Sequence, residues 1–88
     1  MTNIEIRRAV EAEVCKARKK WPESYKDIIH ATALINEEAG ETIQAALDLT
    51  YDNGTIEKVK KETIQTAAMC FRLLENIEKI TTYQHKTK

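Results

Sequence analysis

Residues that break helices are scarce in this sequence, which has two glycines and one proline among 88 residues. That scarcity favours long helices and leaves little material for turns. Acidic and basic residues number fourteen each, so the charge balance indicates neither a nucleic-acid polymer nor an anionic membrane as a partner. There is no apolar run of bilayer-spanning length, and nothing at the N-terminus resembles a signal peptide, so we expect a cytoplasmic protein.

The two cysteines, Cys15 and Cys70, form no metal-binding or redox motif. Single cysteines on apolar helix faces usually behave as small hydrophobic residues, so we expect both to be buried. A chain of 88 residues makes one small domain, which buries only about two-thirds of the surface that the unfolded chain exposes. A monomer of this size would be marginally stable.

Apolar residues recur at helical spacing in three segments of the chain. The first helix is expected from Asn3 to Lys20, and Thr2 with Glu5 has the spacing of a capping box at its start. Pro22 breaks this helix, because proline cannot comfortably continue one.

The second helix is expected to begin near Ser24 or Tyr25 and to end at about Tyr51. The sequence Asp-Asn-Gly at 52–54 follows it and is the strongest turn signal in the chain. Asparagine and glycine both tolerate left-handed backbone geometry, which a helix commonly adopts at its end.

Thr55 then caps a third helix that continues to about Ile80, and the polar segment 81–88 is expected to be a frayed tail. We therefore predict an all-α fold of three helices, in one domain over residues 1–80. The tight turn makes the last two helices antiparallel neighbours, which form a long helical hairpin. At about 1.5 Å per residue the second helix is about 40 Å long, too long for this chain to cover alone. We expect a homo-oligomer, a homodimer or homotetramer, that completes a four-helix-type or larger bundle.

The stretch NEEAGE at 36–41 places three glutamates, Glu37, Glu38 and Glu41, on about one turn of the second helix. Residues three and four apart on a helix lie one above the other, so like charges at this spacing repel. A solvated helix face tolerates that repulsion at little cost. The alternative is a bound cation, and it is favoured because residues 28–47 carry no other acidic side chain.

The hairpin geometry predicts where the partners of these glutamates lie. Counted from the turn, Glu62 and Gln65 on the third helix are nearly level with Glu41 on the second. Oxygen-bearing side chains on facing helices of a bundle suit a hard cation such as Mg²⁺ or Mn²⁺.

Two segments, LINEEAGETIQAAL (34–47) and KETIQTAAMCFRLLE (61–75), carry a recognisable pattern. Together they resemble the MazG-like all-α NTP pyrophosphohydrolases, above all the short phage and bacterial members. That family has a Glu-Glu-x-x-Glu block on one helix and a Glu-x-x-Asp block on the next. The first block is complete here; in the second, Glu62 matches the glutamate and Gln65 stands where aspartate is expected. The resemblance covers roughly residues 21–78.

The resemblance implies hydrolysis of a nucleoside triphosphate to the monophosphate and pyrophosphate. It implies Mg²⁺ held by Glu38, Glu41 and Glu62, with Gln65 supplying at most a neutral oxygen. Glu37, or whichever glutamate does not bind the metal, would position or deprotonate the attacking water, which makes Glu37 and Glu38 the expected catalytic residues. The candidates for binding the outer phosphates are Lys58, Lys61 and Arg72, or else Lys16, Lys19 and Lys26. Three aromatic residues are candidates for stacking on the base, or else for packing in the core or at an interface: Trp21, Tyr25 and Tyr51.

Gln65 leaves alternatives open, because an amide in place of a carboxylate removes one negative charge from the site. It is compatible with one metal ion instead of two, or with a different substrate. It is also compatible with a non-catalytic helical oligomer that binds nucleotides or regulates a partner on the same scaffold. A purely structural helical oligomer is a third interpretation, in which loss of the glutamates has no effect on any activity.

Overall fold

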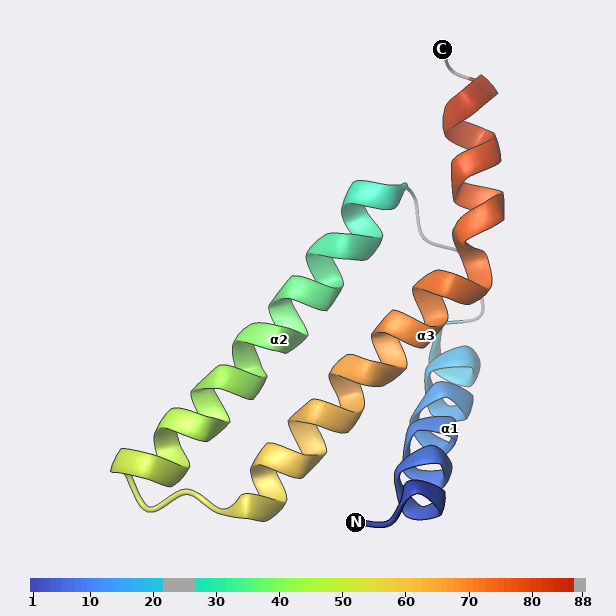
Figure 1. Cartoon of the computed structure of the whole chain (residues 1–88). Coiled ribbons are helices and arrows are strands. Elements are labelled where there is room, and N and C mark those ends of the chain that lie inside the picture. The colour runs from blue at the N-terminus through green and yellow to red at the C-terminus, as the bar shows by residue number, and fades with distance from the viewer. Residues whose placement is uncertain (22–26, 87–88) are drawn as a thin grey trace.

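The computed structural model describes residues 1–21 and 27–86, with side chains described up to residue 80. It contains three helices, α1 (Asn3–Lys20), α2 (Ile28–Tyr51) and α3 (Ile56–Lys86), and no strand in the described residues (Figure 1). The predicted all-α fold and the antiparallel hairpin are confirmed. The expected start of the second helix at Ser24 or Tyr25 lies outside the described residues.

The ends of the helices follow local hydrogen bonding. At the start of α1, the Thr2 hydroxyl accepts a hydrogen bond from the Glu5 backbone N–H at 3.1 Å, and the Thr2 N–H donates to the Glu5 carboxylate at 2.7 Å. This is the predicted capping box. Asp27 caps α2 by accepting a hydrogen bond from the His30 N–H at 2.7 Å. The third helix continues past the expected end at Ile80 to Lys86, so the backbone of much of the segment expected to be a tail is helical.

The turn between α2 and α3 is the predicted Asp-Asn-Gly segment. Asn53 has a φ of 61°, in the left-handed region that asparagine tolerates. The Gly54 N–H donates to the Asp48 carbonyl at 2.8 Å, and a Cβ on Gly54 would lie 2.7 Å from the Asp48 carbonyl carbon. The chain therefore needs glycine at this position for steric reasons.

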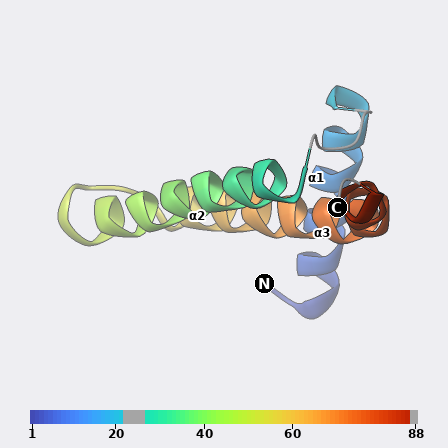
Figure 2. The same ribbon diagram turned by 90° about the horizontal axis from the view of Figure 1, so that it is seen from above.

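The hairpin and α1 form two layers. α2 lies beside the first part of α3, whose C-terminal turns extend past the start of α2 (Figure 1), and the Thr42 and Thr66 hydroxyls are hydrogen-bonded across the two helices at 3.0 Å. α1 crosses the hairpin steeply on the α3 side (Figure 2), and within the described residues it packs against α3 and not against α2. Small side chains permit this close packing. The buried apolar residues are Val14, Ala31, Ala45, Ala68 and Ile80.

Many large apolar side chains that the helical periodicity assigned to the core are exposed in the single chain. Because α1 covers only one side of the hairpin, the opposite sides of α2 and α3 have no neighbour among the described residues. The expected burial of Cys15 and Cys70 is wrong in the single chain, since both are exposed: Cys70 lines the uncovered groove between α2 and α3, and Cys15 lies on a part of the α1 surface that no other described helix covers. No helix in the described part of the chain is long and apolar enough to cross a membrane. The exposed apolar side chains include Ile4, Ile6, Ile43, Leu47, Phe71 and Leu74.

Candidate metal centre

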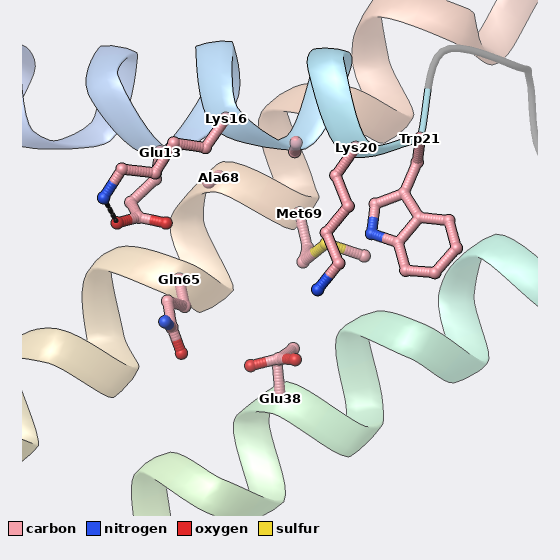
Figure 3. Close-up of a pocket in the computed structure, with 9 residues that line it drawn as sticks. Glu13, Lys16, Lys20, Trp21, Glu38, Gln65, Ala68 and Met69 are labelled. Carbon is pink, nitrogen blue, oxygen red and sulfur yellow. Dashed lines mark hydrogen bonds and ion pairs between the residues drawn. The ribbon is translucent and has the colours of Figure 1, made fainter.

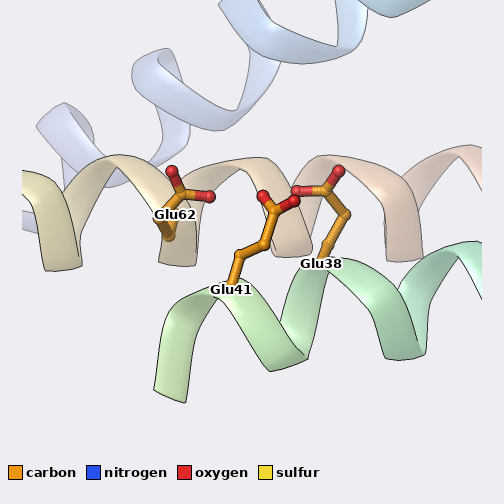
Figure 4. Close-up of side chains that lie close together, drawn as sticks. All are labelled: Glu38, Glu41 and Glu62. Atoms are coloured by element: carbon orange, nitrogen blue, oxygen red, sulfur yellow. The ribbon is translucent and has the colours of Figure 1, made fainter. Parts of the chain in front are cut away.

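Three glutamates meet midway along the hairpin. Glu38 and Glu41 lie one turn apart on α2, and Glu62 reaches them from α3 (Figure 4). Each offers a carboxylate oxygen, and these oxygens all lie within 4.8 Å of one another. The structure thus brings together the residues that the distance from the turn placed level with each other.

Two of the carboxylates carry buried oxygens without a hydrogen-bond partner among the described residues. Glu62 is only 4% exposed; one of its oxygens accepts a hydrogen bond from Lys58 Nζ at 3.0 Å, and the other, Oε2, has no partner. Glu38 Oε2 is buried and unpartnered in the same way. A buried polar atom left without a partner costs free energy, so such atoms call for an explanation. A hard cation fits, because it prefers several carboxylate oxygens as ligands.

The pKa values of the cluster show how its charges interact. Burial raises the pKa of Glu38, and the negative charges of Glu41, Glu62 and Glu37 raise it further. A hydrogen bond between the carboxyl groups of Glu41 and Glu62 raises the pKa of Glu41. By contrast, the hydrogen bond from Lys58 lowers the pKa of Glu62 despite its burial. Carboxylates on both helices thus repel one another, with Lys58 as the ion-pair partner of Glu62.

A cavity of about 280 Å³ adjoins the cluster on the α1 side (Figure 3). Its α2 and α3 walls include Glu38 and the half-buried side chain of Gln65. Its α1 wall includes Lys20 and Trp21, whose side chains extend towards Glu38. Lys20 Nζ lies 5.4 Å from the centroid of the Trp21 ring, within the range of a cation–π interaction. The cavity therefore combines two carboxylates, of Glu13 and Glu38, with a neutral amide, two ammonium groups and an aromatic ring.

The other expected site residues are distributed more widely. Glu37 is exposed on α2, close enough for its charge to raise the pKa of both Glu38 and Glu41. Lys61 is exposed, and it lines a different cavity, between α1 and the first turns of α3. Lys16 lines the cavity beside Glu38 and forms an ion pair with Glu13 at 3.3 Å.

Arg72 differs from the expectation that it binds phosphate. Its side chain is buried, and its guanidinium donates a hydrogen bond to the Trp21 carbonyl at 2.7 Å. A second nitrogen lies 3.7 Å from a Glu75 carboxylate oxygen. The guanidinium is thus engaged within the protein and is not presented to a substrate. Lys26 and Tyr25 lie outside the described residues, and Lys19 and Tyr51 are exposed.

The sequence analysis did not identify Lys20 and Met69 as cavity residues. The spacing contained a signal for Lys20, which lies one helical turn after Lys16 and so shares its face of α1. No such signal marks Met69, because its place in the cavity depends on how α1 packs across α3.

No family model matches this chain, and no curated protein or solved structure is significantly similar to it. The resemblance described above therefore depends on the two acidic blocks and their spacing.

Proposed function

We propose that this protein is a Mg²⁺-dependent pyrophosphohydrolase that cleaves an NTP or dNTP to the monophosphate and pyrophosphate. One observation carries the proposal: Glu38, Glu41 and Glu62 converge from two helices beside a cavity that contains ammonium groups, and two of their buried oxygens have no hydrogen-bond partner among the described residues. A triphosphate in that cavity would have its negative charge between the lysines and a cation held by the glutamates.

In this proposal Glu38, Glu41 and Glu62 hold the metal ion, and Gln65 supplies at most a neutral oxygen. When bound, Mg²⁺ supplies positive charge that offsets the charge of the phosphates. Glu37, or a glutamate oxygen not bound to metal, orients or deprotonates the water that attacks the phosphate. Such a role suits Glu37, which is exposed and one position from Glu38.

In this proposal the substrate is bound by residues on the α1 wall of the cavity and by Lys58. Lys16 and Lys20 would bind the phosphates, and Trp21, which is 63% exposed as a residue, would stack on a base. Lys58 is available for this role only if it exchanges Glu62 for a phosphate, which becomes favourable once a cation neutralises Glu62. The function would be house-cleaning or control of the cytoplasmic nucleotide pool.

The test is pyrophosphate release from a panel of NTPs and dNTPs, measured with Mg²⁺ and with EDTA. We expect metal-dependent release that Glu41→Gln abolishes and that Glu78→Gln, an exposed glutamate of the same charge on α3, leaves unchanged. Release that persists in EDTA or in Glu41→Gln would overturn the proposal.

The second candidate is a non-catalytic nucleotide-binding or regulatory module. The observation that favours it is Gln65, a neutral amide that lines the cavity beside Glu38. A folded protein that binds nucleotides in the presence of Mg²⁺ but releases no pyrophosphate from any of them would establish this function instead.

We also propose that the chain associates with copies of itself. An apolar groove of about 430 Å³ runs between α2 and α3, and it is lined by alanines and threonines together with Ile43 and Cys70. A second hairpin fits it, because two hairpins packed on their small residues form a four-helix bundle. Sedimentation should show a dimer or tetramer that dissociates on dilution, and a monomer at every concentration would contradict this.

A further inference from the structure

Arg72 is a buried cation whose role the candidate metal centre does not explain. It is 8% exposed, and a charged side chain is rarely buried unless it is paired. Its principal contact is with a backbone group: Nη2 donates a hydrogen bond to the Trp21 carbonyl oxygen at 2.7 Å. The ion pair with Glu75 is longer, at 3.7 Å.

Glu75 is shared with a second arginine. Arg18, on α1, donates from Nε to one Glu75 oxygen at 3.3 Å and from Nη2 to the other. Two arginines and one carboxylate thus join the last turn of α1 to α3. Arg18 joins the two helices through side chains, by its hydrogen bonds to Glu75, whereas Arg72 donates directly to the backbone at the end of α1.

The Trp21 carbonyl lies at the C-terminal end of α1, where Trp21 is the capping residue. The last carbonyl groups of a helix have no partner within it, and the end of the helix carries a partial negative charge. A buried cation from another helix both donates a hydrogen bond to one of these carbonyl oxygens and offsets the partial negative charge. Arg72 therefore acts as a C-terminal cap that α3 supplies to α1.

This cap bears on the cavity because of how the three helices pack. α1 contacts α3 and, in the described residues, does not contact α2. The distance from Lys20 and Trp21 to Glu38 on α2 therefore depends on the attachment of α1 to α3, together with the chain segment 22–26 that joins Trp21 to α2. The contact nearest to Trp21 in that attachment is the one made by Arg72.

We propose that Arg72 is a positioning residue, which holds the last turn of α1 so that Lys20 and Trp21 face the carboxylates. Its effect on nucleotide binding depends on the proposed function, whereas its effect on Trp21 does not. A lysine at this position keeps the charge but makes no forked contact, so it restores the contact only in part.

The chain offers a direct probe, because Trp21 is its only tryptophan. Fluorescence anisotropy decay and acrylamide quenching of the metal-free protein report the mobility and accessibility of this side chain. We expect Arg72→Met to increase fast ring motion, with Arg72→Lys in between, and to raise the quenching constant by less than twofold because Trp21 is already 63% exposed. The control is Glu78→Gln, which removes an exposed charge from α3 and leaves the contacts of Arg18, Arg72 and Glu75 in place, and it should resemble the wild type. If Arg72→Met fails to fold, as judged by circular dichroism, the comparison of Trp21 mobility between Arg72→Lys and the wild type tests the proposal instead.

Kinetics provide the second readout. We expect Arg72→Met to raise KM for the preferred nucleotide about tenfold, because a hydrogen bond to a charged group is worth at least that factor, with kcat within about threefold of the wild type. Unchanged Trp21 mobility together with an unchanged KM would overturn the positioning role. A mobile Trp21 in a protein that turns over no nucleotide would support the cap and refute the proposed function, so the two failures are distinguishable.

Discussion

Replacing Glu38 by glutamine should stabilise the metal-free protein. The substitution conserves the size of the side chain and removes one negative charge from the three-carboxylate cluster. Burial and the neighbouring carboxylates already raise the pKa of Glu38, which means that its ionised form is unfavourable in the folded state. Glutamine at this position relieves that cost and leaves the neighbouring side chains in place.

The distance between the carboxylates determines how much stability the Glu38→Gln substitution should add. The interacting oxygens of Glu38 and Glu62 lie within 4.8 Å. At that separation two unit charges repel by about 0.9 kcal/mol in water and by about 3.5 kcal/mol at an effective dielectric constant of about 20. Because Lys58 offsets part of the Glu62 charge, we expect a gain in stability near the lower of these two values, about 1 kcal/mol. For a domain of this size that corresponds to a rise in Tm of about 4–8 °C.

The assay is thermal unfolding followed by circular dichroism, in EDTA and in Mg²⁺, at one protein concentration because self-association also shifts Tm. Mg²⁺ at tenfold its Kd should stabilise the wild type by about 1.4 kcal/mol and the Glu38→Gln variant by much less. Glu78→Gln, at an exposed position on α3, serves as the control for loss of a negative charge. A lower Tm of Glu38→Gln in EDTA would refute the reasoning, since it would show that the Glu38 carboxylate contributes to stability without metal.

Three further predictions follow from the same structure. The stability gained by Glu38→Gln should be largest near pH 8. It should vanish as the pH falls through the raised pKa of Glu38 towards the ordinary value of 4.5, because protonation of Glu38 then removes the same charge. A difference in Tm that does not change with pH would contradict this. Gln65→Asp should tighten Mg²⁺ binding in calorimetry by adding a carboxylate beside Glu38, and unchanged or weaker affinity would show that position 65 is not a ligand position. Gly54→Ala should destabilise the protein by about 1–3 kcal/mol in urea unfolding, because its Cβ would lie 2.7 Å from backbone atoms of Asp48 and Leu49, and an unchanged midpoint would show that the turn relaxes freely.

The sequence by itself determined the hairpin and the meeting of the glutamates. Helix caps and turns depend on neighbouring residues, so the capping box at Thr2 and the turn at 52–54 could be read directly. Once the turn is known, the constant rise of a helix determines which residues are level across the hairpin. That is why Glu62 could be placed opposite Glu41 from its distance to the turn alone.

Burial was harder to predict, because periodicity shows which face of a helix is apolar but not whether anything covers it. Cys70 lies on an apolar face of α3 and is exposed, since α1 covers a different side of the hairpin. Ile43 and Phe71 both belong to runs of apolar residues at helical spacing, yet both are exposed in the single chain.

Only the tertiary structure decided where α1 lies, and with it the cavity beside the carboxylates. The contacts between α1 and α3 join residues about fifty positions apart, and no local pattern specifies which of many charged side chains will meet. Arg72 reads in the sequence as an ordinary cation on a helix, and its burial against the Trp21 carbonyl results from the packing of two helices. Local hydrogen bonding and helical rise could therefore be deduced from the chain, whereas the crossing of α1 over α3, a balance of many weak contacts, could not.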